Sequence, residues 1–409
     1  MKERIEALEE VILSPEFNPL ADQGPSAKGQ QKLAAQLKRD SMVAASQISQ
    51  KIKSTYKLKT SGKIFNKVHA HLRGELLGKF ELHKDGVWYI TSANRYNKLL
   101  IATASADGSA GIFDLSSQGT FLCNPVATYT GHQGCSVNCV KFHPKYDLLI
   151  TAAGDSGSHI WRPNYEQIFA QRSSDPEDKD SPDEGQAIKQ PIVELSGHSN
   201  VVVGCDWLST VDQCVTASWD RNANLYDLHT GELVMQLMGH DQELTDVAAH
   251  PSSPLVVTSS HDTTFRLWDF RESIHSVCVF QGHSERVNST AFLGNDKVVS
   301  GSDDRTAKVW DLKNMRSPLA NIHVESPINK LAVSQNLMAI PLENRNVRVY
   351  DGSGARVCRL PRSHHERMVT CASFAPTASA ATSLTQLFTC AFDRKVCWWS
   401  LTAEKSEKS

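Results

Sequence analysis

The chain has 409 residues, a formal net charge of −2 and 40% hydrophobic residues. A charge so close to zero gives no overall attraction to nucleic acid or to an anionic membrane. No apolar run approaches the roughly 18 residues of a membrane-spanning helix, and the charged start, Met-Lys-Glu-Arg, lacks the apolar core of a secretory signal. The ten cysteines include no Cys-x-x-Cys pair, so we expect reduced cysteines in an intracellular protein, with neither a metal site nor a cofactor.

Residues 1–75 contain no repeat and are expected to form a lead-in. Apolar residues share one helical face between Glu3 and Leu13, which predicts a short amphipathic helix; a frayed terminal helix without a partner is the alternative. Residues 14–29 contain several Pro and Gly residues, which is typical of a linker.

A basic arm follows, because residues 41–74 contain seven Lys and Arg residues and no acid. Such a segment suits an acidic partner, an anionic lipid or a nucleic acid. The alternative is a solvated, partly disordered lead-in. Only Tyr56 and Phe65 interrupt the basic run, which argues against a surface for stacking bases.

Beyond the lead-in, an acidic or amide residue lies six positions before an aromatic residue seven times. The pairs are Asp107/Phe113, Asp155/Trp161, Asp220/Tyr226, Asp262/Trp268, Asp304/Trp310, Asn344/Tyr350 and Asp393/Trp399. The aromatic residues lie 48, 65, 42, 42, 40 and 49 positions apart. One blade of a WD40 propeller takes roughly 40–45 residues. The repeat therefore predicts an all-β fold, a seven-bladed WD40 β-propeller over residues 76–401.

Each repeat also offers partners for a buried polar network. An indole N–H can only donate and needs an acceptor when buried. We expect a loop His to bond the turn Asp, the same His to meet a Ser or Thr, and that hydroxyl to accept the indole N–H. Full sets are His132, Thr151, Asp155 and Trp161; His240, Thr258, Asp262 and Trp268; and His283, Ser300, Asp304 and Trp310. The seventh repeat offers His365, Thr389, Asp393 and Trp399, but its longer loop leaves the identity of its His open.

Three repeats depart from this pattern. His198, Thr216 and Asp220 precede Tyr226 instead of Trp, and His83, Thr103 and Asp107 precede Phe113, which has no donor. The sixth repeat has Ile340 in place of the hydroxyl and Asn344 in place of the acid, so it is expected to be the least rigid blade. Recurring His, Ser and Asp could suggest catalysis. A nucleophilic site requires one exposed set with an oxyanion hole, so repeated sets favour a structural role and a protein that is not an enzyme.

The end of the last repeat predicts how the ring is completed. After Ser400 only nine residues remain, and residues 402–409 form a charged tail. The last blade therefore lacks an outermost strand, and the apolar run Leu76–Leu82 is expected to supply it. A ring closed by an N-terminal strand leaves no exposed sheet edge at that point.

One long insertion, residues 164–190, interrupts the third repeat. Six of the ten residues from Asp175 to Glu184 are acidic, so the insertion is expected to be disordered. Ser174 and Ser181 are candidate phosphorylation sites whose modification would deepen the acidic cluster. The alternative is an unstructured loop that only adds solubility.

A partner is expected on the face that carries the His loops and Asp turns. Three positions in each repeat point there: the residue before the Asp, and the third and fifth residues after the His. They include Trp88, Trp219, Glu243, His261, Arg286, Asp303, Met368 and Phe392. Trp and Arg are typical of binding hot spots, although some of these residues can pack within the loops instead. Trp219 and Phe392 are expected to be exposed, since turn tips rarely bury their side chains.

The Gly-His pairs at 131–132, 197–198, 239–240 and 282–283 and the Trp-Asp pairs at 268–269 and 310–311 are WD40 signatures. The stretches Thr216–Asp227, Val257–Arg271 and Gly301–Ser317 resemble, more closely, the family of WD repeat-containing protein 37. This resemblance implies a non-enzymatic scaffold, in cytoplasm and nucleus, that pairs with the phosphofurin acidic cluster sorting proteins. It implies protein partners and no small-molecule substrate.

A second function is suggested by Trp268-Asp269-Phe270-Arg271. A Trp-Asp-x-Arg ending resembles the motif of propellers that act as substrate receptors of cullin–RING ubiquitin ligases. In that case Arg271 would contact the ligase adaptor. A single tetrapeptide is a weak signal, because Arg often follows the repeat by chance.

Overall fold

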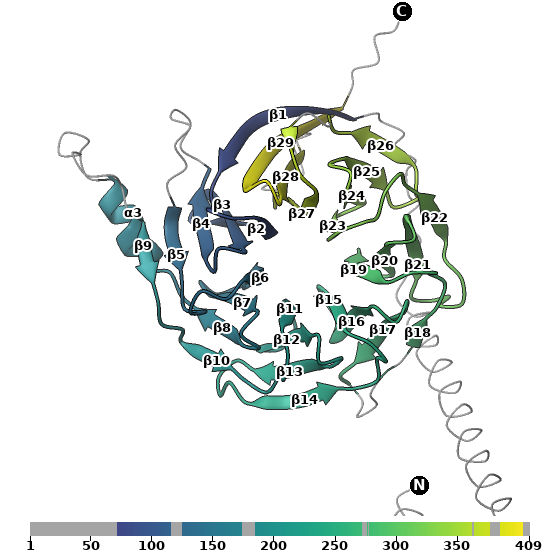
Figure 1. Ribbon diagram of the computed structural model, residues 1–409, viewed down its shortest axis with the longest axis horizontal. Helices are drawn as coiled ribbons and strands as arrows, with labels where there is room; N and C mark the ends of the chain where they lie inside the picture. The colour runs from purple at the N-terminus through teal and green to yellow at the C-terminus, as the bar shows by residue number, and fades with distance from the viewer. Residues whose placement is uncertain are drawn as a thin grey trace, which may run out of the picture. The chain divides into compact units, whose positions relative to one another are not determined.

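The computed structural model describes residues 72–115, 125–173, 185–271, 276, 278–361, 364–376 and 385–403. Seven sheets stand side by side around a common axis, with one strand of each sheet nearest that axis (Figure 1). The prediction of a seven-bladed β-propeller is therefore confirmed. The predicted helix at residues 3–13, the linker and nearly all of the basic arm lie outside the described residues. Within the described part of the chain, no helix has the length and apolar character needed to cross a membrane.

The blades are numbered here in chain order, and each begins with its innermost strand. The first has β2 (Val87–Arg95), β3 (Lys98–Ser105), β4 (Ala110–Asp114), β5 (Pro125–Tyr129) and β9 (Gln186–Ile188). The second has β6 (Val137–Phe142), β7 (Leu149–Ala153), β8 (Ser158–Trp161) and β10 (Val193–Leu195). The third has β11 (Val202–Leu208), β12 (Gln213–Ser218), β13 (Ala223–Asp227) and β14 (Leu233–Leu237).

The remaining blades follow the same order. The fourth has β15 (Leu244–Ala249), β16 (Leu255–Ser260), β17 (Phe265–Asp269) and β18 (Cys278–Phe280). The fifth has β19 (Val287–Leu293), β20 (Lys297–Ser302), β21 (Thr306–Asp311) and β22 (Ala320–His323). The sixth has β23 (Ala332–Ser334), β24 (Leu337–Pro341), β25 (Val347–Asp351) and β26 (Arg356–Arg359). The seventh has β27 (Val369–Phe374), β28 (Thr385–Ala391), β29 (Lys395–Ala403) and β1 (Leu72–Glu81).

The outermost strand of the seventh blade comes from the start of the described chain. β1 pairs antiparallel with β29, from Leu72 opposite Ala403 to Glu81 opposite Lys395. Residues 72–75 and 402–403 thus belong to the sheet, not to the lead-in and tail assigned from the sequence. The strand extends further than its apolar run because backbone pairing does not depend on hydrophobicity, and Leu72 still packs on the core of the blade.

The prediction that residues 164–190 are disordered was wrong at both ends. Residues Tyr165–Ser173 form the helix α3, and β9 pairs in parallel with β5 of the first blade. Tyr165 and Ile168 are buried in the core shared by the first and second blades, and the ring of Phe169 packs against that of Tyr165. The acidic composition of the insertion concealed these apolar residues, which recur at helical spacing. Ser174, Ser181 and the acidic segment between α3 and β9 lie outside the described residues.

The hydrophobic core lies between neighbouring blades. One buried cluster joins Val299 and Val309 of the fifth blade to Ile340 and Tyr350 of the sixth. Alternating strand residues face these layers, as expected for sheets that pack on both faces. The inner strands are thereby fixed, and they position the side chains around the axis.

Candidate functional site

Three blades contain the complete network of imidazole, carboxylate, hydroxyl and indole. In the fourth blade, His240 Nδ1 lies 2.7 Å from Asp262 Oδ2, and His240 Nε2 lies 2.8 Å from Thr258 Oγ1. The indole of Trp268 donates to the same hydroxyl at 2.8 Å. The fifth blade repeats these contacts through His283, Asp304, Ser300 and Trp310, at 2.8, 2.8 and 2.9 Å.

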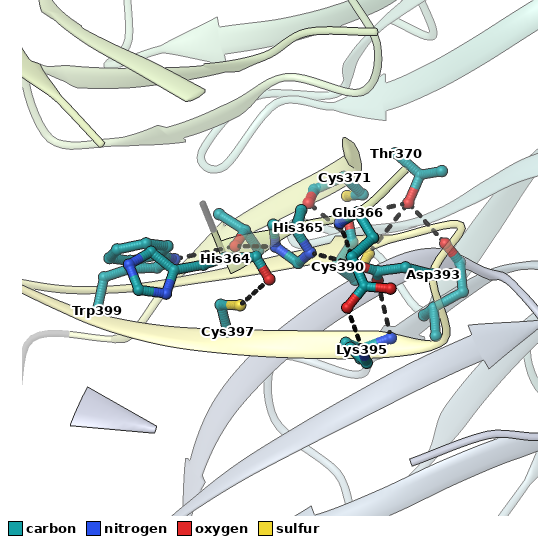
Figure 2. A network of polar contacts seen from close by, with 12 residues as sticks. His364, His365, Glu366, Thr370, Cys371, Cys390, Asp393, Lys395, Cys397 and Trp399 are labelled. Carbon is teal, nitrogen blue, oxygen red and sulfur yellow. Dashed lines mark hydrogen bonds and ion pairs between the residues drawn. The ribbon is translucent and has the colours of Figure 1, made fainter. Parts of the chain in front are cut away.

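The seventh blade contains the same network (Figure 2). His365 Nδ1 lies 3.2 Å from Asp393 Oδ2, and its Nε2 lies 2.9 Å from the hydroxyl of Thr389, which also accepts the indole N–H of Trp399. The backbone N–H of Glu366 donates to Asp393 as well, at 2.8 Å. The longer loop before this blade has not changed the geometry of its network.

The first three blades keep the imidazole contacts and differ at the aromatic residue. His83, His132 and His198 each bond their Asp and Thr at 2.7–3.0 Å. Phe113 has no donor, and Tyr226 donates its hydroxyl to the carbonyl of Ser196 at 3.0 Å.

The expectation for Trp161 was wrong. Its indole N–H has no hydrogen-bond partner among the described residues. The ring of Tyr129 stacks on that of Trp161 at 4.8 Å, and the Tyr129 hydroxyl bonds His159 at 2.7 Å. The imidazole of His159 in turn stacks on that of His132 at 3.9 Å. Aromatic packing therefore replaces the indole hydrogen bond in the second blade.

The carboxylates of the network are charged. Burial by itself would raise the pKa of Asp262 and Asp304, but hydrogen bonds from His240 and His283 hold each pKa well below its ordinary value. Six blades keep the imidazole contacts, and in each of them both ring nitrogens of the imidazole are already hydrogen-bonded. A general base needs a nitrogen within reach of a substrate proton, so this geometry supports a structural role rather than catalysis.

In the sixth blade, an ion pair between Arg and Glu stabilises the region that corresponds to the His–Asp contact of the other blades. Nη2 of Arg348, which is buried, lies 2.8 and 3.0 Å from the two carboxylate oxygens of Glu325. The amide of Asn346 also donates to Glu325, at 3.1 Å. A charge-assisted pair thus takes the place of the missing imidazole and carboxylate, and Ile340 is fully buried beside it. The sequence analysis missed this substitution because neither residue belongs to the repeat pattern.

A pocket of about 440 Å³, called here the axial pocket, lies where the innermost strands begin. Five of the eight residues predicted for the partner-binding face line it, and Glu243, His261 and Phe392 do not. The five are Trp88, Trp219, Arg286, Asp303 and Met368. They come from four different blades, so only the closed ring brings them together.

The predicted residues of this face also contact one another. The ring of Phe392 packs against that of Trp88 at 5.0 Å, and the indole of Trp88 donates to Ser136 Oγ at 3.0 Å. Trp88 is therefore held in one orientation. Phe392 is half-buried against it, so the expectation that this side chain is exposed was wrong. Trp219 is 43% exposed. Glu243, which is exposed, lies 3.6 Å from the half-buried His261.

Several lining residues were not named from the sequence. Val203, Thr245, Asn288 and Thr370 all line the axial pocket. Each is the fifth residue after its loop His, so the same positional rule could have found them. Asn329 and Lys330 do not follow a loop His at this spacing, so the positional rule could not have found them.

Arg271, proposed from the sequence as a contact for a ligase adaptor, follows the end of β17 and is not among the residues that line the axial pocket. Its Nε lies 2.9 and 3.0 Å from the carboxylate oxygens of Asp269. The guanidinium is therefore already engaged within its own turn. Adaptor binding through Arg271 stays a prediction.

Comparison with known proteins gives one family and a set of close relatives. The family model "WD domain, G-beta repeat" matches residues 123–162, 189–227, 231–269 and 274–311. WD repeat-containing protein 37 from Mus musculus is 44% identical over 409 residues, which covers 93% of this chain and 80% of the relative. The Homo sapiens protein is 45% identical with the same coverage, and the Xenopus laevis protein is 43% identical over 96% of this chain and 83% of its own length.

Proposed function

Because the chain belongs to the WD40-repeat family of WD repeat-containing protein 37, we propose that it is a protein-interaction scaffold whose axial pocket receives a partner protein. The propeller and the relatives support a scaffold of this kind. The repeated networks keep the blades rigid, and a rigid surface loses little conformational entropy when it binds.

The observation that carries this proposal is the composition of the axial pocket. Trp88 and Trp219 face a common hollow together with Met368 and Arg286. Aromatic and Arg residues around a concave centre are typical of binding hot spots. The pocket volume of about 440 Å³ is also within the range of sites that enclose a ligand group.

The resemblance noted from the sequence names the partner class. We propose that the phosphofurin acidic cluster sorting proteins bind this chain, in cytoplasm and nucleus. The support is the family membership, since relatives named WD repeat-containing protein 37 match nearly the whole chain.

The test is co-purification of a phosphofurin acidic cluster sorting protein with the full chain and with Trp219→Ala. Trp219 is a partly exposed side chain, so its truncation should leave the melting temperature unchanged while weakening binding at least about tenfold. Leu319→Ala is the matched control, because Leu319 is 53% exposed but is not part of the pocket lining. Equal capture by Trp219→Ala and the unaltered chain would reject the axial pocket as the binding site.

A further inference from the structure

Side chains at the start of the innermost strands link each blade to the next. Asn138 donates to the carbonyl of Val202 at 2.8 Å, Asn288 to Ile328 at 2.8 Å and Asn329 to Val369 at 2.7 Å. Thr245 donates to the carbonyl of Val287, Thr370 to Val87 at 2.6 Å, and Trp88 to the hydroxyl of Ser136. Six of the seven blade junctions therefore carry a hydrogen bond from this position.

The junction between the third and fourth blades is the exception. Val203 occupies the position of these donors, and valine has no hydrogen to donate. Among the described residues, no side chain donates to the carbonyl of Leu244, which corresponds to that of Val287 at the next junction. Val203 instead lines the axial pocket beside Val201 and Trp219. The missing hydrogen bond at this junction thus leaves an apolar wall in the pocket.

The axial pocket is consequently divided into two halves. Its apolar residues come from the seventh, first and third blades: Met368, Trp88, Val201, Val203 and Trp219. Its charged residues come from the loops and strands of the fifth and sixth blades: Arg286, Asp303, Lys330 and Glu343. A ligand that fills the whole pocket must therefore carry an apolar group next to a polar one.

The charged half of the axial pocket favours the binding of a cationic group. Arg286 contacts the carboxylate of Asp303, and Lys330 Nζ lies 2.9 Å from Asp246 Oδ1. These two basic residues are thus compensated within the protein. Glu343 is exposed, and its carboxylate has no ion-pair or hydrogen-bond partner within the described part of the chain. An incoming basic group would pair with it without displacing an existing contact.

We propose that the axial pocket binds a short segment of a partner protein in which a large apolar side chain lies next to a Lys or Arg. The apolar side chain packs between Trp219 and Trp88 against Val203, and the basic group pairs with Glu343. This inference rests on the proposed function and specifies the chemistry of the partner at that site.

The probe is a random peptide display library selected on the purified full chain. The expected result is enrichment of peptides with an aromatic residue, Leu or Met within two positions of a Lys or Arg. A synthetic peptide with the enriched sequence would then be titrated by fluorescence anisotropy. Enriched peptides without this pairing, or no enrichment at all, would overturn the proposal.

Two substitutions test the two halves of the pocket separately. Val203→Asn restores the missing link between blades and makes the wall polar, so peptide affinity should fall about tenfold while the melting temperature stays equal or rises. Val203→Thr, which is isosteric, serves if the Asn variant does not fold. Val279→Asn is the control, because Val279 is an exposed valine on the outer strand β18. Unchanged affinity in both Val203 variants would overturn the proposal.

Glu343→Gln removes the charge and keeps the shape. Peptide affinity should fall roughly threefold to tenfold, and its dependence on salt should become weaker. Equal affinity and equal salt dependence would show that no basic group binds there. This outcome leaves the proposed function standing if Trp219→Ala still weakens capture of the partner protein, so the two failures are distinguishable.

Discussion

Nη2 of Arg348 donates to both carboxylate oxygens of Glu325 in the sixth blade, at 2.8 and 3.0 Å. Arg348 is 2% exposed, whereas the Glu325 side chain is 46% exposed. The pair lies where the other blades have a buried imidazole bonded to an aspartate. The blade that lacks the repeat signature has thus kept an ionic connection between its loop and its third strand.

Removing one member of this pair should destabilise the protein more than removing both. Glu325→Ala leaves the buried Arg348 charge without its carboxylate, at a cost of about 1–3 kcal/mol in the free energy of unfolding, because the partly exposed Glu325 makes the pair only partly buried. In the double variant Glu325→Ala/Arg348→Met the uncompensated charge is absent, so part of that stability should return. Urea unfolding measures the free energy of unfolding of the single and the double variant. A double variant less stable than the single variant would contradict this account.

The imidazole–carboxylate contacts should make a measurable contribution to stability. Asp262→Ala leaves His240 without its partner in a buried position and should cost about 2–3 kcal/mol. Asp262→Asn keeps an oxygen within reach of His240 Nδ1 and should cost less, which makes it the control. Thermal and urea unfolding test both variants. An unchanged melting temperature in Asp262→Ala would show that the network does not stabilise the blade.

Strand β1 should be required for a stable ring. A variant that lacks residues 1–82 exposes the edge of β29, since β1 is its hydrogen-bonded neighbour. Exposed edges pair with other chains, so this variant should aggregate and melt at lower temperature. A variant that lacks only residues 1–71 keeps β1 and is the control. Size-exclusion chromatography compares them, and equal monomer fractions would mean that β1 is dispensable.

Mild acid should destabilise the protein through histidines whose pKa is lowered by burial, and His143 and His250 are two of them. Burial lowers the pKa of His143 to about 4, and burial also lowers the pKa of His250. His143 Nδ1 accepts backbone N–H groups from Lys145 and Tyr146 at 3.0 and 2.9 Å, which requires an unprotonated nitrogen. His250 Nδ1 accepts the N–H of Ser252 at 3.1 Å in the same way.

The direction of this pH effect on stability follows from the number of protons that the folded and unfolded states bind. Below its ordinary pKa of 6.5, a His in the unfolded chain is protonated, while folded His143 stays neutral down to about pH 4. The unfolded state therefore binds more protons in this window, and the free energy of unfolding falls as the pH falls from 6.5 to about 4. His143→Gln should flatten this slope in urea unfolding, whereas His229→Gln, at an exposed imidazole, should not. Equal slopes in all three proteins would refute the assignment.

The repeat allowed much of the fold to be predicted from the sequence. In the fifth blade, Lys297, Ser300 and Trp310 could be placed on strands because one blade is one continuous stretch of chain with its own alternation and its own turn. The helix α3 could not be foreseen in this way, because the acids between Ser174 and Glu184 dominated the composition of that insertion. The parallel pairing of β9 with β5 joins segments that no local pattern relates.

By itself, the sequence determined the number of blades, the family and the positions of the His–Asp contacts, since all of these depend on spacing within about 45 residues. Only the tertiary structure decided that Trp88, Trp219 and Met368 share one pocket and that Phe392 packs behind it. The physical reason is distance along the chain. The pocket exists because the ring closes, and the hydrogen bond from Thr370 to Val87 joins residues 283 positions apart.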